Sequence, residues 1–122
     1  MIIVKGKVWT FNGWVSVENL KIGDLIIDRA GSARKLLGIE KVVVANALNF
    51  KSKPNLLLSS DSLIYSNTGS IQVLKDGEYN IRMENNATVN DMITIKSYNG
   101  YGYKLSIQDG IDCFVEGYNV QL

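Results

Sequence analysis

Short runs in which apolar and polar residues alternate make up most of the chain, and turn residues separate them. Lys7–Phe11 and Trp14–Val17 alternate on either side of Asn12-Gly13, a dipeptide typical of tight β-hairpins. The segment Glu18–Ile22 is long enough for one helical turn only, and Leu25–Ile27 is again a short apolar run. No stretch shows the three-to-four-residue period of a longer amphipathic helix. The pattern therefore predicts an all-β chain of many short strands.

The rest of the chain continues in the same manner. Leu36–Ala45 is expected to form one long strand or a strand pair, and Asn46–Asn55, with the only proline, is expected to connect it to the next strand. Ser97–Tyr103 is rich in Gly and Tyr and is expected to be a flexible hairpin tip; the alternative is a surface on which bases or sugars stack. The final strands are expected at Lys104–Gln108, Cys113–Val115 and Tyr118–Leu122.

The central segment Leu56–Ser66 interrupts an apolar run with four polar residues. Leu56–Leu58 and Leu63–Tyr65 have the composition of strands buried on both faces, and Ser59–Ser62 lies between them. Ser and Asp side chains bond their own backbone in turns, so one interpretation is a tight turn between two core strands. The other is a catalytic corner, because buried polar groups are costly unless they are paired or serve a site.

Two segments of the first half recur in the second half. Thr10–Val17 is similar to Ser66–Val73, and Ile22–Asp28 is similar to Val89–Ile95. Each copy opens with a strand, a turn that ends in Gly and a second strand, and each later has an Asp before an apolar strand. We therefore expect a single domain over residues 1–122, built from related halves of roughly 1–58 and 59–122 about a pseudo-two-fold axis.

Composition and charge narrow the function classes. The net charge is +1, from 13 basic and 12 acidic residues scattered along the chain. We therefore expect no basic patch that would bind nucleic acid or a membrane surface. The longest apolar runs are too short to span a bilayer, and the first residues do not resemble a signal peptide. The single cysteine, Cys113, fits a reducing compartment. We expect a cytoplasmic or phage-associated protein, not a secreted one, whose partner is a flanking polypeptide or another protein. Its oligomeric state, including domain swapping, stays open.

The chain contains no histidine. This absence removes the commonest general base, the commonest metal ligand and every nucleophilic pair that relies on His. With a single cysteine as well, a zinc site would have too few soft ligands. We therefore expect no metal and no cofactor.

The order of these features resembles a Hint domain, the self-processing fold shared by inteins, the processing domain of hedgehog proteins and bacterial intein-like domains. Members have a Thr, a Gly turn, a Glu-containing segment and Gly-Asp after the first residue, a central Thr-x-x-His, and a closing block with Asp, Phe and Gly. The matching positions are Thr10, Gly13, Glu18, Gly23-Asp24, Ser59–Ser62, Asp109, Phe114 and Gly117. The resemblance spans the chain and implies a compact all-β horseshoe of short strands with a pseudo-two-fold repeat.

The resemblance also implies where a catalytic site would lie. In such domains the first side chain attacks the preceding carbonyl, the central Thr and His activate that amide, and in splicing members a terminal His-Asn pair cleaves the second junction. The positions that match this site are Met1, Ser59, Ser62, Lys104, Gln121 and Leu122, and Ile111 stands where many members have a further His.

Most of these positions lack the chemistry that the family needs. The thioether of Met1 forms no acyl intermediate, and Ser62, at the His position, carries no proton near neutral pH. Ser59 is a fair substitute for Thr, whereas Leu122 cannot cyclise as Asn does. Lys104 stands where some members have Asp, and we expect its ammonium to pair with Asp61. Several independent losses imply a decayed activity.

Other polar and aromatic residues have two interpretations each. Cys113 is expected to be a buried, inert thiol; the alternative is a reactive one. Asp24 and Asp91 are expected to accept hydrogen bonds from turn amides; the alternative is a carboxylate pair. Trp9 and Trp14 are expected on opposite faces of their hairpin, as core residues or with one exposed as a partner anchor.

Three functions follow in order of preference. The first is a catalytically inactive, degenerate Hint domain of phage or mobile-element origin that acts as a structural or binding module. The second is a self-processing domain whose nucleophile is replaced by Met1, which a native Cys or Ser at that position would favour. The third is an unrelated β-sandwich or β-barrel that binds a ligand through Ser97–Tyr103.

Overall fold

The computed structural model describes residues 1–122 and is built almost entirely of β-strands. The strands are β1 Ile3–Lys5, β2 Lys7–Thr10, β3 Gly13–Ser16, β4 Leu25–Ile27, β5 Ala33–Phe50, β6 Lys53–Ser59, β7 Leu63–Ser66, β8 Gly69–Gln72, β9 Gly77–Arg82, β10 Thr88–Ile107, β11 Asp112–Val115 and β12 Tyr118–Gln121. The prediction of an all-β chain is confirmed. The single helical element, the 3-10 turn η1 over Val17–Asn19, is far too short to cross a membrane.

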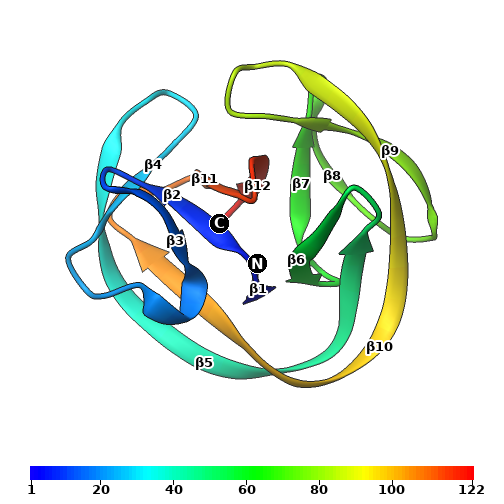
Figure 1. Ribbon diagram of the computed structural model, residues 1–122, viewed down its shortest axis with the longest axis horizontal. Coiled ribbons are helices and arrows are strands. Elements are labelled where there is room, and N and C mark those ends of the chain that lie inside the picture. The colour runs from blue at the N-terminus through cyan, green and yellow to red at the C-terminus, as the bar shows by residue number, and fades with distance from the viewer.

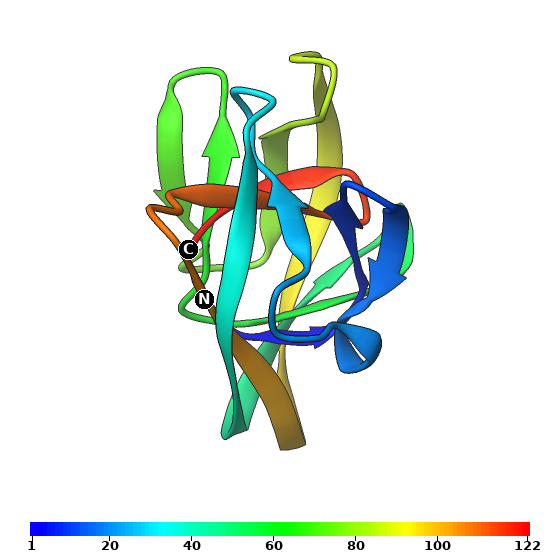
Figure 2. The same cartoon turned by 90° about the vertical axis from the view of Figure 1, so that its left-hand side faces the viewer.

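Two long strands organise the molecule. Strands β5 and β10 pair antiparallel along most of their length, for example at Lys41 with Tyr103, and form a ribbon that curves around the shorter strands (Figure 1). Seen from the side, the bend of this ribbon projects beyond the rest of the molecule (Figure 2). Strand β4 pairs with the beginning of β5, and β9 pairs with the beginning of β10. The expected horseshoe of strands is therefore present.

The two halves open with matching hairpins, which confirms the first part of the predicted repeat. In the β2–β3 hairpin the Thr10 hydroxyl donates to the Gly13 carbonyl (2.7 Å) and accepts from the Asn12 N–H (3.2 Å). In the β7–β8 hairpin the Ser66 hydroxyl donates to the Gly69 carbonyl (3.1 Å) and accepts from the Thr68 N–H (3.2 Å). The same two hydrogen bonds of a side-chain hydroxyl thus close both turns, as expected for a pseudo-two-fold repeat.

The second part of the predicted repeat was placed on the wrong strand. Val89–Ile95 lies inside the long strand β10, whereas Ile22–Asp28 contains the short strand β4. The counterpart of β4 is β9, because each follows a hairpin and pairs with the beginning of the next long strand. The sequence match that corresponds to Leu20–Asp24 is therefore Leu74–Glu78, which reads LKDGE beside LKIGD.

Two segments expected to be loops are strands. Asn46–Phe50 continues β5, and only Lys51 and Ser52 separate it from β6, in which Pro54 is exposed. Ser97–Tyr103 is the middle of β10, with a bulge between Ser97 and Gly100. Long-range pairing of the two segments overrides their loop-like composition. The third function, which needed a Gly- and Tyr-rich loop on an unrelated fold, is thereby contradicted.

Glycines explain the composition of that segment. A Cβ atom on Gly100 would lie 2.9 Å from the Tyr98 ring, and one on Gly102 would lie 2.5 Å from the Ile2 side chain. Gly100 therefore makes room for the Tyr98 ring, and Gly102 lets β1 approach β10 closely.

Nineteen buried hydrophobic residues form one cluster to which both halves contribute. Leu58 and Ile64 are fully buried in it, as the apolar runs on either side of Ser59–Ser62 predict, and so is Ile3 of β1. Such burial stabilises each side chain by about 2 kcal/mol relative to exposure.

The two tryptophans share one face of their hairpin, which contradicts the prediction of opposite faces. Trp9 and Trp14 are direct cross-strand partners, and their rings stack with centroids 5.9 Å apart. Directly opposed residues of an antiparallel pair always project to the same side. Trp9 also meets Phe114 edge to face (5.6 Å), whereas Trp14 remains 41% exposed.

Candidate functional site

The first and last residues of the chain meet beside Ser59–Ser62. Strand β1 lies between β6 and β10, and β12 lies between β11 and β7. Both ends of the chain lie close together in two perpendicular views (Figures 1 and 2). Strand β12 pairs with β7 at Val120 and Ile64, and continuing that register brings Leu122 level with Ser62. The positions at the two ends that match the family site therefore converge on the serine segment.

Ser59 and Ser62 form a buried hydroxyl pair. Their Oγ atoms are 3.1 Å apart and share a hydrogen bond, and the Ser59 Oγ also accepts from the Ile2 N–H at 3.1 Å. Ser59 is 4% exposed and Ser62 is fully buried. The Ser62 N–H donates to the Ser59 carbonyl, so the segment is also a tight turn. The interpretation as a tight turn between core strands is therefore confirmed, whereas the catalytic corner stays a prediction.

The terminal residues are held by packing and by main-chain bonds. Met1 and Leu122 are half-buried and pack against the core cluster. The Leu122 N–H donates to the carbonyl of Ile111 (2.9 Å), and Gln121 pairs with Asp112 across β11 and β12. None of these side chains offers a nucleophile or a cyclising amide at the chain end.

Lys104 lies on β10 beside the start of the chain, but its side chain is exposed. Continuing the register of Ile3 with Tyr103 brings Ile2 level with Lys104, and Glu40 lies opposite on β5. Asp61 is also exposed, and the only side-chain ion pair in the chain joins Arg34 to Asp28. The predicted Lys104–Asp61 pair is therefore wrong.

The serine pair consequently has no proton carrier bonded to it. Its hydroxyls contact each other and one main-chain N–H, and no buried side-chain polar atom of the protein lacks a partner. A cavity of about 190 Å³ adjoins Ser59 between Ile2 and Val44, and its only charged lining residue is Asp61, whose side chain is exposed. The arrangement can orient the first peptide by accepting its hydrogen bond, but it offers no general base.

Cys113 is the buried, unreactive thiol that the sequence predicted. It is fully buried in β11, and burial, with the nearby charge of Asp112, raises its pKa from the ordinary 9.0 to about 12. The thiolate is the reactive form, so the thiol is inert at neutral pH.

Asp24 and Asp91 do not pair with each other. The Asp24 carboxylate accepts from the Lys21 N–H (2.9 Å) in a turn, as predicted. Asp91 is 2% exposed and accepts from the Tyr118 hydroxyl (2.7 Å) and from the Ser52 N–H (3.0 Å). Burial and then the Asp91 carboxylate raise the pKa of Tyr118.

A polar network around Asn119 was missed. Asn119 is fully buried; its Oδ1 accepts from the Arg82 Nε (3.0 Å) and Nη2 (2.8 Å), and its Nδ2 donates to Asp112 (2.6 Å). The Arg29 N–H also donates to Asp112 (2.9 Å), so this network connects the two halves. The Asn between Tyr118 and Val120 is the only signal in the sequence. No group of three or more His, Cys, Asp or Glu side chains is placed to hold a metal ion.

Solved structures of similar shape agree on one fold. The solution structure of a bacterial intein-like domain from Clostridium thermocellum has a TM-score of 0.82 at 16% identity, covering 99% of this chain and 98% of that one. The crystal structure of the gp41-1 intein has a TM-score of 0.78 at 15% identity, covering 99% and 97%. The MchDnaB-1 intein has a TM-score of 0.73 at 9% identity and full coverage of both chains. No family model and no curated protein matches the chain. These likenesses show the fold, which is the Hint fold.

Proposed function

Because the chain has the Hint fold, we propose that it is a catalytically silent, intein-like domain that serves as a structural or binding module. One observation carries the proposal. At the place where the family's central Thr and His would act, Ser59 and Ser62 form a buried hydroxyl pair bonded only to each other and to the Ile2 N–H.

An acyl shift makes three demands on such a site. It needs a nucleophile at the first residue, a group that protonates the departing amide nitrogen, and donors for the developing oxyanion. Met1 supplies no nucleophile, and Ser62 has no titratable proton near neutral pH. At the other end, Leu122 has no amide with which to cyclise. Two of the three demands therefore fail at different residues, and the cyclisation of splicing members fails at a third, so the proposal does not depend on one substitution.

The chain ends are nevertheless held firmly by the strands around them. The chain ends lie close together beside β7, and main-chain hydrogen bonds hold both: Ser59 N–H to the Ile2 carbonyl (2.9 Å) and Leu122 N–H to the Ile111 carbonyl (2.9 Å). We infer a module that keeps two flanking segments close together without cutting either. A phage or mobile-element origin and a cytoplasmic location stay predictions from the sequence.

A second candidate is a self-processing domain with an altered mechanism. The contact between the Ser59 Oγ and the Ile2 N–H favours it, because a hydroxyl then lies one residue from the peptide that such a domain would cut. This candidate requires Ser59 to polarise that peptide without a histidine.

Intact-mass analysis separates the two candidates. The domain is expressed between two small folded proteins, purified and incubated with and without a thiol, and the Ser59→Ala variant is treated in parallel. We expect a single uncut species in every sample. A cut before residue 1 or after residue 122 that is lost in Ser59→Ala would overturn the silent-module proposal and establish the second candidate.

A further inference from the structure

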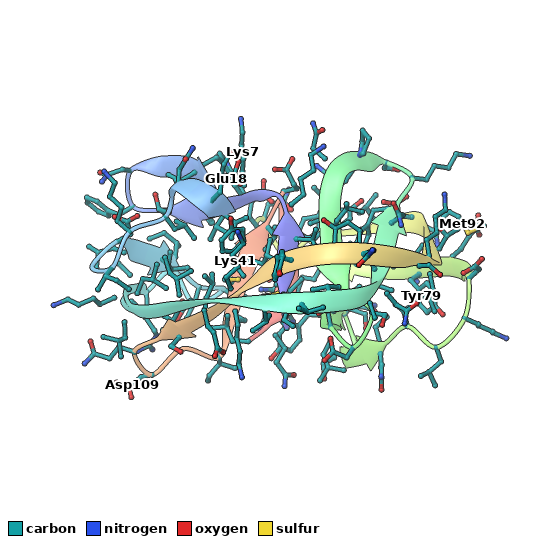
Figure 3. The ribbon with its side chains drawn as sticks, turned by 90° about the horizontal axis from the view of Figure 1, so that it is seen from below. Lys7, Glu18, Lys41, Tyr79, Met92 and Asp109 are labelled. Atoms are coloured by element: carbon teal, nitrogen blue, oxygen red, sulfur yellow. The ribbon has the colours of Figure 1, made fainter.

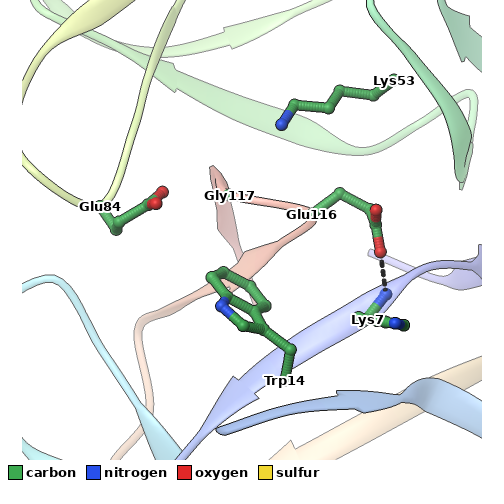
Figure 4. A pocket seen from close by; sticks show the side chains of 6 residues that line it. All are labelled: Lys7, Trp14, Lys53, Glu84, Glu116 and Gly117. Carbon is green, nitrogen blue, oxygen red and sulfur yellow. Dashed lines mark hydrogen bonds between the residues drawn. The ribbon is translucent and has the colours of Figure 1, made fainter.

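Three neighbouring cavities form one groove along the surface. The first, of about 320 Å³, is lined by Trp14, Lys53 and Glu84, and it shares Lys7 and Glu116 with the second, of about 200 Å³. Figure 4 shows the first cavity, with Trp14 and Lys53 on opposite sides of the β11–β12 turn.

The groove continues to the ribbon. The second cavity shares Lys5 and Glu18 with the third, of about 510 Å³, which reaches Lys41 and Tyr101. Figure 3 shows Glu18 and Lys41 well away from Met92 and Tyr79, which lie at the opposite end of the molecule.

Both charge signs line the groove along its length. Four lysines and three glutamates contribute to it: Lys5, Lys7, Lys41, Lys53, Glu18, Glu84 and Glu116. None of them forms an ion pair within the chain, since the only such pair is Arg34 with Asp28. Glu116 accepts from the main-chain N–H of Lys7 (2.6 Å), which fixes the carboxylate between the first two cavities. No opposite charge of the chain therefore neutralises these groups, although the Lys53 ammonium lies 5.4 Å from the centre of the Tyr118 ring.

Aromatic rings occupy both ends of the groove. At one end Trp14 is 41% exposed, and its ring is held by stacking on Trp9 at 5.9 Å. At the other end Tyr101 is 56% exposed, with the Lys41 ammonium 5.1 Å from its ring centre. Rings that are exposed yet fixed by neighbours are typical anchors of protein interfaces, because they lose little entropy on binding.

We propose that this groove, from Trp14 to Tyr101, binds an extended polypeptide segment that carries both charge signs and an apolar or aromatic residue near each end. Charge complementarity selects this partner: alternating lysines and glutamates pair with a peptide of mixed charge. The four lysines alone would attract the phosphates of a nucleic acid strand, and the tyrosines could stack on its bases, but the three glutamates would repel that strand, whereas a peptide of mixed charge can pair with both kinds of residue. The inference gives a partner class to the binding role proposed above and rests on that proposal.

The test uses a display library of random dodecapeptides selected against the whole domain. The most enriched peptides are then synthesised and titrated against wild type and the variants Trp14→Ala, Tyr101→Ala and Lys53→Glu. Phe11→Ala is the matched control, because Phe11 is 69% exposed and lines none of the three cavities. Circular dichroism checks that every variant is folded. An oligothymidine strand serves as the nucleic acid probe.

We expect enriched peptides with both charge signs and an aromatic residue. Trp14→Ala and Tyr101→Ala should each weaken their binding about tenfold or more, whereas Phe11→Ala leaves it unchanged. The proposal is overturned if no sequence is enriched or if the affinity of the enriched peptides is unchanged in both aromatic variants. It is also overturned if oligothymidine binds as tightly as these peptides. Self-association of the free domain that is lost in Trp14→Ala would also overturn it, since a second copy would then be the occupant. Because this test measures binding and the mass assay measures cleavage, either proposal can fail without the other.

Discussion

Two kinds of polar cluster in the molecule differ in charge and in how far apart in the sequence their members lie. Ser59 and Ser62 are neutral, lie three residues apart and bond within one turn. The second kind is charged and joins strands far apart in the sequence: Asp91 with Tyr118, and Arg82 with Asn119 and Asp112. Since a buried charge must be fully hydrogen-bonded, groups of the second kind are costly to disturb.

This difference indicates what the molecule needs its polar groups for. The charged clusters connect β9, β10 and β11 to β12. Main-chain N–H groups of Arg29 and Ser52, both in the first half, donate to Asp112 and Asp91, so these clusters also join the two halves. Near the chain ends, by contrast, the hydrogen-bonded side-chain groups are the two neutral hydroxyls of Ser59 and Ser62. The comparison therefore predicts large effects on stability at the charged clusters and small ones at the serine pair.

The largest effect is expected for Asp91→Ala. This change leaves the buried Tyr118 hydroxyl without an acceptor and frees the Ser52 N–H, so we expect a loss of about 3 kcal/mol in unfolding free energy. Urea denaturation followed by fluorescence measures it. Asp61→Ala is the control: Asp61 is exposed and should change stability by less than about 0.5 kcal/mol. Equal effects of the two substitutions would remove the basis of the comparison.

Asn119→Ala is expected to rank second, at about 2 kcal/mol. The substitution removes the acceptor of two Arg82 donors and the donor to Asp112, but both of these side chains are partly exposed and can turn to water. The same denaturation experiment applies, with Asn80→Ala, at an exposed position, as its control. A loss no larger than that of the control would show that the network does not hold the halves together.

Ser62→Ala should have the smallest effect on stability, about 1 kcal/mol. Ser59 keeps its hydrogen bond from the Ile2 N–H, and the lost partner is one neutral hydroxyl. Ser70→Ala, at an exposed position of β8, is the matched control. If Ser62→Ala lowers the unfolding free energy as much as Asp91→Ala does, the serine pair, and not the charged clusters, stabilises the fold.

The reactivity of the Cys113 thiol measures how well β11 is buried in the core. Raising its pKa from 9.0 to about 12 lowers the thiolate fraction at pH 8 about a thousandfold, since three pH units separate the two values. A thiol reagent should therefore label Cys113 only through unfolding, whereas Ser70→Cys in a Cys113→Ala background is labelled at once. The raised pKa also means that this thiol contributes stability below pH 9 that is lost between about pH 9 and 12. Fast labelling of the native domain would contradict the burial of β11.

The sequence was informative wherever structure is decided locally. Asn12-Gly13 and the two Gly-ending turns predicted both hairpins, because side-chain bonds within four residues close them. Asn46–Asn55 and Ser97–Tyr103 were predicted as loops from their composition, and pairing of β5 with β10 and β6 decided otherwise. Such long-range pairings have no signal in a window of ten residues.

The site could be predicted only through resemblance. Nothing in composition or periodicity indicates that Ile2 bonds to Ser59 or that β12 pairs with β7, since these contacts join residues more than fifty positions apart. Side-chain placement was the weakest point: Trp9 and Trp14 share a face, and Lys104 forms no ion pair with Asp61, because each depends on strand register.

The central claim is that several losses, not one, silence the domain, and graded repair tests it most directly. The cleaved fraction is measured by intact mass, with added thiol, for Met1→Cys alone and for Met1→Cys with Ser62→His, in the same fusion between two folded proteins. We expect the single variant to stay intact, because no proton carrier adjoins Ser59, and the double variant to be cut before residue 1. Cleavage of the single variant at the rate of the double would contradict the account and show that only the nucleophile was missing.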